Sequence, residues 1–150
     1  MKRFVIHEHK ANRAGLHYDL RLETSFPGKG KGLLSFASRK LQALLDKKLK
    51  RVLLFETAWH ETFWLHFKGV IAEGYGKGEL SILDSGKYEL LKDQSMYKAY
   101  TGGHIVIHIH GKKYDECLSL VRMDKIKNEF NGINPKKTWL CTLVHCNRYT

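Results

Sequence analysis

The residues best suited to chemistry form an alternating polar run near the N-terminus. Residues 17–23 read H-Y-D-L-R-L-E. On a β-strand, alternate side chains share a face, so His17, Asp19 and Arg21 project together and the leucines project to the other side. The Cα atoms of His17 and Asp19 are then about 7 Å apart, and the two side chains can converge on one divalent ion.

His7 and His9 repeat this alternation on a preceding strand, and residues 10–16 form the loop that returns the chain beside it. Two imidazoles and a carboxylate suit Mn²⁺, Zn²⁺ or Fe²⁺. An arginine on the same face favours phosphate chemistry, because a guanidinium can hold phosphate oxygens. The alternative interpretation is an ordinary amphipathic strand whose polar face is solvated.

The elements that must position these residues are mostly strands, because hydrophobicity of period two dominates the chain. The predicted strands are Phe4–His9, His17–Glu23, Leu33–Ser38, Val52–Thr57, Phe63–Ala72, Glu79–Leu83, Lys87–Leu91, His104–His110, Cys117–Arg122 and Thr138–Cys146. A helix is predicted over Arg39–Lys50 and a weaker one over Met123–Phe130. The pattern indicates one all-β-dominated domain over residues 1–150: a β-barrel of about eight or more strands, or a strongly curled sandwich, with one or two short flanking helices.

The composition points to a polyanionic partner. The 150 residues include 26 Lys and Arg against 15 Asp and Glu, a net charge of +11, and such an imbalance attracts anions such as nucleic acid. The basic residues gather in two sets: Lys29, Lys31, Arg39, Lys40, Lys47, Lys48, Lys50 and Arg51, then Lys112, Lys113, Lys125, Lys127, Lys136 and Lys137. No apolar run is long enough for a membrane span, so we expect no membrane association.

The cysteines and a second group of histidines offer further metal chemistry. Three cysteines without paired spacing, Cys117, Cys141 and Cys146, argue against a disulfide framework and for a reducing, cytoplasmic location. A zinc site using Cys141, Cys146 and His145 is less favoured than buried thiols. In residues 104–110, H-I-V-I-H-I-H, the isoleucines share the core face, and the histidines are either metal ligands or the wetter face of a barrel strand.

The polar run also carries a resemblance. With His9 before it, L-H-Y-D-L-R-L-E at residues 16–23 resembles the signature of the 3′-phosphoesterase domain of bacterial DNA ligase D and its stand-alone relatives. Further similar motifs follow in collinear order: L-S-F-A at 34–37, F-K-G-V-I-A-E-G at 67–74 with Y-G-K-G after it, D-S-G-K-Y-E at 84–89, H-G-K-K at 110–113, L-V-R-M at 120–123 and W-L at 139–140.

The resemblance implies a β-barrel enzyme that heals DNA 3′ ends with manganese. Such an enzyme removes a 3′-terminal ribonucleoside, then the remaining 3′-phosphate, and leaves a 3′-OH. The implied metal ligands are His9, His17 and Asp19. The implied phosphate-contacting arginine is Arg21, and the second catalytic histidine falls on His60.

Several positions depart from the family pattern. Trp64 stands where the family has a tyrosine, and His7 stands where it has a glutamine, so His7 is an additional ligand or a donor behind the ligands. The segment E-T-A-W-H from Glu56 to His60 is two residues longer than the family's, and His66 competes with His60 for the catalytic position. Glu56 is a further candidate, either at the site or behind it. The family's polar N-terminal extension has no counterpart before Phe4, which makes the monoesterase step more secure than the diesterase step.

In this interpretation water attacks a 3′-phosphate that Arg21 holds, and His60 donates to the phosphate or to the leaving oxygen. The expected partners are DNA with 3′-phosphate or 3′-ribonucleotide ends, with a DNA ligase and a polymerase that act in trans. The protein itself is expected to be a monomer. Two alternatives stay open: a metal-dependent oxygenase on a cupin-like barrel, and a non-catalytic, basic nucleic-acid-binding barrel.

Overall fold

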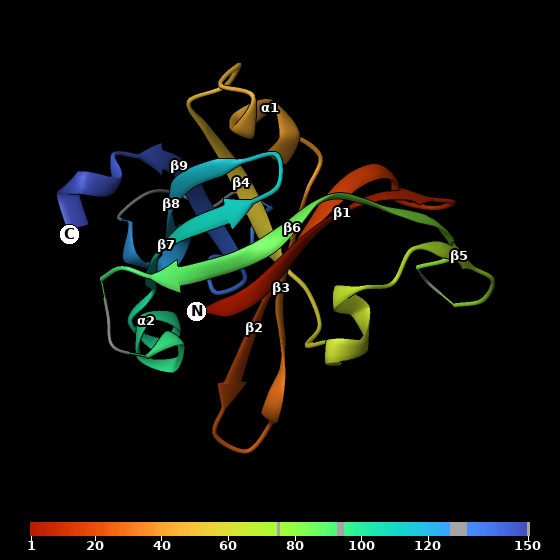
Figure 1. Cartoon of the computed structure of the whole chain (residues 1–150), viewed down its shortest axis with the longest axis horizontal. Helices are drawn as coiled ribbons and strands as arrows, with labels where there is room; N and C mark the ends of the chain where they lie inside the picture. The colour runs from red at the N-terminus through yellow and green to blue at the C-terminus, as the bar shows by residue number, and fades with distance from the viewer. Residues whose placement is uncertain (75, 93–94, 127–131, 150) are drawn as a thin grey trace.

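The strands form one antiparallel sheet that closes on itself (Figure 1). The computed structural model describes residues 1–74, 76–92, 95–126 and 132–149. Its strands are β1 (Lys2–Ala11), β2 (Gly15–Phe26), β3 (Gly30–Ser38), β4 (Arg51–Glu56), β5 (Gly69–Ile71), β6 (Gly78–Leu90), β7 (His104–Gly111), β8 (Asp115–Arg122) and β9 (Thr138–Val144). The helices are α1 (Leu41–Leu45) and α2 (Met96–Gly102), with 3₁₀ turns η1 (Thr62–Leu65), η2 (Met123–Lys125) and η3 (Cys146–Tyr149).

Eight of these strands make a barrel in the order β1-β2-β3-β4-β9-β8-β7-β6, and pairing of β1 with β6 closes it. Strand β5 is an extra strand on the first residues of β6. The prediction of an all-β barrel with about eight or more strands and short flanking helices is confirmed.

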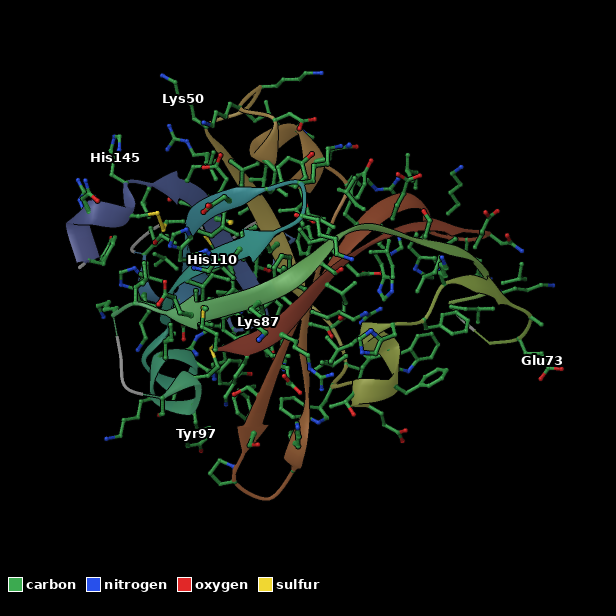
Figure 2. The ribbon with its side chains drawn as sticks, viewed as in Figure 1. Lys50, Glu73, Lys87, Tyr97, His110 and His145 are labelled. Carbon is green, nitrogen blue, oxygen red and sulfur yellow. A yellow bond between two sulfur atoms is a disulfide. The ribbon has the colours of Figure 1, made fainter. Side chains whose placement is uncertain are left out.

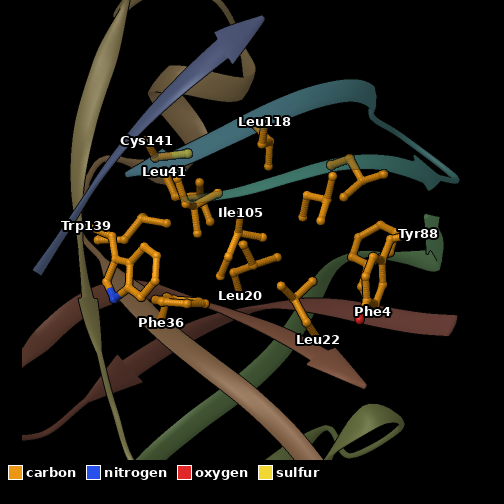
Figure 3. Packing of buried hydrophobic residues seen from close by; sticks show 14 of the residues in the cluster. Phe4, Leu20, Leu22, Phe36, Leu41, Tyr88, Ile105, Leu118, Trp139 and Cys141 are labelled. Carbon is orange, nitrogen blue, oxygen red and sulfur yellow. The ribbon is translucent and has the colours of Figure 1, made fainter. Parts of the chain in front are cut away.

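The barrel interior holds the main hydrophobic core (Figure 3). Ile105, Ile107 and Ile109 of β7 are fully buried there, as the alternation of that strand predicts. Leu20 and Trp139 face them from β2 and β9. Because Leu20 points inward, its neighbours Asp19 and Arg21 must point to the outer face of the barrel wall.

The helix predicted over Arg39–Lys50 is too long, since α1 ends at Leu45. Lys47 adopts a left-handed conformation with φ 63°. The N–H of Lys47 then donates to the carbonyl of Leu44, and that of Lys48 donates to the carbonyl of Ala43. These two bonds form a Schellman motif, which satisfies the last carbonyls and turns the chain toward β4. Leucine spacing indicates the buried face of α1 but does not reveal this early stop.

The strand predicted over Phe63–Ala72 is also wrong. The chain forms η1, then the three-residue strand β5. Gly69, with φ 138°, interrupts the segment. Leu65 is the buried anchor of η1 and packs on Val5 and Leu33 from outside the barrel, whereas Val70 is 73% exposed. Because single residues such as Leu65 hold the segment to the barrel, its hydrophobic residues follow neither the period of a helix nor that of a strand.

The two strands predicted over Glu79–Leu83 and Lys87–Leu91 are a single strand, β6. Its pairing with β1 skips one residue: Ile6 lies opposite Asp84 and His7 opposite Ile82, which leaves Leu83 as an extra residue. A β-bulge of this kind bends the strand instead of reversing it. The D-S-G motif therefore marks a bend in the barrel wall and not a hairpin.

Asp84 at this bulge holds the turn between β7 and β8. Its buried carboxylate accepts from the backbone N–H groups of Ser85, Lys113 and Tyr114 at 2.9–3.0 Å. We expect Asp84→Ala to lower the free energy of unfolding by about 2–4 kcal/mol, because buried N–H groups would lose their acceptor. Urea denaturation measures the loss. Ser81→Ala, at an exposed position of the same strand, is the control; equal stability of the two variants would contradict the role of Asp84.

Other differences lie near the C-terminal half. Helix α2 was not predicted, although Ser95 caps its N-terminus and Gly103, with φ 76°, follows its last residue. Of the helix predicted over Met123–Phe130, the first residues form η2, and residues 127–130 lie outside the described part of the chain. The last strand ends at Val144 and not at Cys146.

The cysteines differ from expectation as well. Cys117 of β8 and Cys146 of η3 form a disulfide, and Cys141 is a free thiol buried in the core. The expectation of three unpaired thiols is therefore wrong, because folding brings together two cysteines that are 29 residues apart in sequence. None of the described helices is long and apolar enough to cross a membrane.

Candidate metal and phosphate site

Antiparallel pairing of β1 with β2 assembles the predicted polar cluster. His9 lies directly opposite His17, and His7 lies opposite Asp19. The imidazole rings of His9 and His17 have centroids 4.6 Å apart. The structure thus brings His7, His9, His17 and Asp19 together on the outer face of the barrel, with Arg21 one step further along β2.

This polar face is buried, so the solvated-face alternative is wrong. Asp19 is 4% exposed, Arg21 5% and His9 7%. The segment between β4 and β6 borders the face: the Nε2 atom of His9 lies 2.8 Å from the carbonyl oxygen of Gly76, and that of His7 lies 2.8 Å from the carbonyl oxygen of Phe67. Figure 1 shows this yellow-green segment on the side of the molecule away from β8 and β9. Charged groups that are buried this deeply are stable only when they are paired or bind a metal ion. Their burial together therefore indicates a binding site.

Hydrogen bonding to carbonyls fixes which ring nitrogens point inward. A carbonyl only accepts, so His9 donates its Nε2 proton to Gly76, and its Nδ1 faces an oxygen of Asp19 at 3.3 Å. In the same way the Nδ1 of His17 lies 3.3 Å from the Gly15 carbonyl, and its Nε2 faces the other Asp19 oxygen at 3.4 Å. Unless the rings are protonated, lone pairs of two imidazoles and a carboxylate therefore face one another.

A divalent cation fits this arrangement. One ligand atom each of His9, His17 and Asp19 lies within 4.8 Å of the others. The contacts of 3.3–3.5 Å that Asp19 makes to both histidines and to Arg21 are longer than charge-assisted hydrogen bonds of about 2.7–2.9 Å. The carbonyls on the far ring nitrogens orient the two imidazoles, as the outer groups of metal sites commonly do.

The same contacts set the charges of the site. Burial raises the pKa of Asp19, but its close contacts with His17 and His9 and the charge of Arg21 outweigh burial and hold this pKa well below its usual value. The contact with Asp19 raises the pKa of His17 against the effect of burial. Asp19 is therefore an anion across the physiological range, as a metal ligand must be.

Three side chains of β1, β2 and β3 contact the guanidinium of Arg21. Its Nη1 donates to the hydroxyl of Ser35 at 3.0 Å, its Nε donates to the Nδ1 of His7 at 3.3 Å, and its Nη2 lies 3.5 Å from Asp19. His7 donates from Nε2 to the Phe67 carbonyl, so both of its ring nitrogens are engaged. His7 thus contacts the guanidinium and is not one of the three residues whose candidate ligand atoms converge.

His60 reaches Arg21 through a backbone bridge to β3. The N–H of Leu33 donates to the carbonyl of His60 at 2.8 Å, and the N–H of His60 donates back at 3.2 Å. The Nδ1 of His60 lies 2.6 Å from the Ala58 carbonyl and 3.1 Å from the Nη1 of Arg21. Donation to Ala58 leaves Nε2 as the free nitrogen. Burial, and then the charge of Arg21, lower the pKa of His60.

Within the described part of the chain, the remaining predicted site residues, Trp64, Glu56 and His66, form no hydrogen bond with Asp19 or Arg21. Trp64 stands edge-on to the His60 ring with centroids 6.0 Å apart. The carboxylate of Glu56 is engaged by Tyr100, Lys137 and Trp139 at the barrel end. His66 is exposed beside Arg3. The geometry therefore favours His60 over His66 as the imidazole beside Arg21.

Sequence reasoning did not identify Ser35 or the two carbonyls that orient His7 and His9. Ser35 lies opposite Arg21 in the pairing of β2 with β3. Ser35 belongs to the L-S-F-A motif, but its contact with Arg21 depends on the register between β2 and β3, which the alternation of side chains does not fix. The carbonyls of Phe67 and Gly76 belong to the irregular segment, for which the predicted secondary structure was wrong.

The buried His7 predicts a pH dependence of stability. Burial lowers its pKa to about 4 from an ordinary value of 6.5. Between these values the unfolded chain takes up a proton that the folded chain does not, so acidification from pH 6.5 to 4 should destabilise the metal-free protein. The contribution of His7 is about 3 kcal/mol.

Chemical denaturation in EDTA across this pH range tests the contribution of His7 against a His7→Gln variant. Glutamine can donate to Phe67 and accept from Arg21 without titrating. The variant should therefore show a smaller loss of stability on acidification than the parent protein. Parallel pH profiles for the two proteins would contradict a neutral, buried His7.

Comparison with known proteins identifies the class of protein to which this barrel belongs. Residues 7–122 match the model of the DNA ligase D 3′-phosphoesterase domain. The chain belongs to this family, whose members are in general metal-dependent and whose activity supports a role in healing 3′ ends. It is 37% identical over 125 residues to the multifunctional non-homologous end joining protein LigD of Mycolicibacterium smegmatis. The alignment covers 80% of this chain but only 15% of that relative.

Proposed function

We propose that the protein is a manganese-dependent phosphoesterase that removes 3′-phosphates, and 3′-terminal ribonucleosides, from DNA primer strands to leave a 3′-OH. The observation that carries the proposal is the buried convergence of His9, His17 and Asp19 beside Arg21. Family membership supports the reaction class. The sequence resemblance supports manganese, and two imidazoles with one carboxylate suit this ion.

The chain's own residues have separable tasks in this reaction. A divalent cation on His9, His17 and Asp19 would act as a Lewis acid on a phosphate oxygen and neutralise part of its charge. Arg21, held in place by Ser35 and His7, binds a second phosphate oxygen through its planar fork.

His60 lies beside the guanidinium, with its Nδ1 3.1 Å from the Nη1 of Arg21, and its Nε2 would hold the proton for the leaving 3′ oxygen. A phosphate dianion on Arg21 would offset the charge that lowers the pKa of His60, and so favour its protonated form. The ring of Trp64 lies perpendicular to that of His60 and would limit the orientations of the imidazole. Water is the nucleophile.

A groove beside the site supports a nucleic-acid substrate. His17 lines a cavity of about 910 Å³, together with the basic residues Arg39, Lys40 and Arg51 and the apolar Phe55, which is 48% exposed. Basic side chains can follow a phosphate backbone, and an exposed aromatic ring can stack on a base. We place the primer strand here, and the net charge of +11 would strengthen its binding at low salt.

Release of inorganic phosphate from a primer–template with a 3′-phosphate tests the proposal. We expect release with Mn²⁺, none with EDTA, and none from His17→Ala. His145→Ala, which removes an exposed imidazole, is the matched control. Salt-sensitive DNA binding without turnover would instead identify a non-catalytic nucleic-acid-binding barrel, and unchanged release from His17→Ala would show that the metal site is misplaced.

A primer with one 3′-ribonucleotide tests the diesterase step separately. Its conversion to a 3′-phosphate and then to a 3′-OH would support both activities. The relative from M. smegmatis is a multifunctional end-joining protein far longer than this chain. We therefore propose that a ligase and a polymerase act on the healed end. That the protein is a monomer stays a prediction.

A further inference from the structure

A second group of metal-ligating side chains lies on β7, β8 and η3, which are different elements from those that carry the histidines of β1 and β2. His108 and Cys117 are directly opposite each other in the pairing of β7 with β8. Cys117 is joined to Cys146. One ligand atom each of His108, Cys117 and Cys146 lies within 4.8 Å of the others.

This cluster lies outside the barrel core. Ile107 and Leu118, the chain neighbours of His108 and Cys117, are opposite each other and both point into the core. By alternation His108 and Cys117 point outward. Cys117 is nevertheless only 1% exposed. We attribute its burial to η3, which brings Cys146 over this part of β8.

Carboxylates surround His108. Asp115 accepts a hydrogen bond from its Nε2, and Glu89 lies 3.6 Å from its Nδ1. Glu89 also lies 3.1 Å from the Nε2 of His110, which stacks on His108 with ring centroids 3.8 Å apart. Lys87 lies opposite His110 on β6; Figure 2 labels both residues.

We propose that, once the disulfide is reduced, Cys117, Cys146 and His108 bind a zinc ion on the outer wall of the barrel. Two thiolates and an imidazole are typical ligands of structural zinc, and the thiolates select zinc over manganese. The fourth ligand is water or a neighbouring carboxylate. Because His108 has a carboxylate near each ring nitrogen, one nitrogen can bind the metal while the other donates to a carboxylate, a frequent arrangement around zinc.

Replacement of the disulfide by a zinc ion requires a reductant. A dithiol or phosphine supplies two electrons that break the S–S bond, the two sulfurs take up two protons, and the reductant is oxidised. Zinc binding then releases these two protons as the thiols become thiolates. Either cross-link, the disulfide or the metal, fastens η3 to β8, so the C-terminal turn stays attached in reducing and oxidising conditions.

Cobalt substitution tests the site without any measurement of enzyme activity. Co²⁺ added to the reduced full-length chain should give sulfur-to-cobalt charge-transfer absorption at one equivalent, and Zn²⁺ should abolish this absorption. Metal bound by His9, His17 and Asp19 has no sulfur ligand and gives no such absorption. The oxidised chain should not give it either. Cys117→Ser and Cys146→Ser should each lose it, and His108→Ala should weaken binding at least about tenfold.

Cys141→Ser is the matched control, because this third cysteine is buried in the core on the opposite face of the sheet and should leave the absorption unchanged. In the wild-type chain, Zn²⁺ should also protect two thiols from alkylation, with Cys117 and Cys146 identified by mass spectrometry. This second measurement needs no variant to fold. A reduced chain that shows neither sulfur-to-cobalt absorption nor protection would overturn the proposal, as would loss of the signal in Cys141→Ser alone.

Discussion

Asp19→Asn should lower kcat/KM for 3′-phosphate removal by about 10³-fold or more, because a metal's stabilisation of transition-state charge is worth several kcal/mol. Asparagine keeps the shape of the side chain but loses the negative charge that faces His9 and His17. Affinity for Mn²⁺ should fall in parallel. Phosphate release measured over a range of Mn²⁺ concentrations separates lost affinity from lost turnover. The electron paramagnetic resonance signal of free Mn²⁺ measures binding directly.

Glu23→Gln is the control for this experiment. Glu23 is a second buried carboxylate on the same face of β2, but Arg3 and Lys31 pair with it. Its loss should reduce stability and leave Mn²⁺ affinity intact. Equal effects of the two substitutions on Mn²⁺ binding would show that Asp19 has no special place in the metal site.

Arg21→Lys should lower kcat/KM by about 10²–10³-fold, the effect of removing one well-oriented donor to transition-state charge. The guanidinium contacts Ser35, His7 and Asp19 and, in the proposed function, also binds the phosphate. The single ammonium group of lysine cannot reproduce this planar set of donors. Mn²⁺ affinity should change little, because the ligands stay in place. Single-turnover assays at saturating metal measure the effect on the chemical step.

Arg3→Lys is the matched arginine substitution, since Arg3 pairs with Glu23 on the same face. It should leave phosphate release near the wild-type rate. Wild-type kcat/KM in Arg21→Lys would mean that the phosphate binds elsewhere. A large loss of Mn²⁺ affinity would mean that Arg21 supports the metal and does not hold the substrate.

The parts of the site that could be predicted from the sequence lie on regular strands. In β2, alternation alone places His17, Asp19 and Arg21 on one face, because side chains of a strand alternate regardless of what packs on them. The isoleucines of β7 are buried for the same reason. The family resemblance then indicated which polar face carries chemistry, a choice that charge and spacing left open.

The parts that could not be predicted depend on contacts between distant segments. Nothing periodic in residues 57–76 indicates that the carbonyls of Phe67 and Gly76 orient His7 and His9. The pairing of Cys117 with Cys146 likewise follows from where η3 lies on β8. The bulge at Leu83 was missed because a D-S-G sequence suits a bend as well as a hairpin.

The backbone bridge between Leu33 and His60 would let His60, the proposed catalytic histidine, tolerate a change in loop length. The peptide groups of β3 fix the position of His60, so residues 57–59 need only span the gap from the end of β4. Two added residues can bulge away from the barrel without displacing the imidazole. Deletions or insertions in this connector should therefore be far milder than any substitution, such as Leu33→Pro, that removes a hydrogen of the bridge.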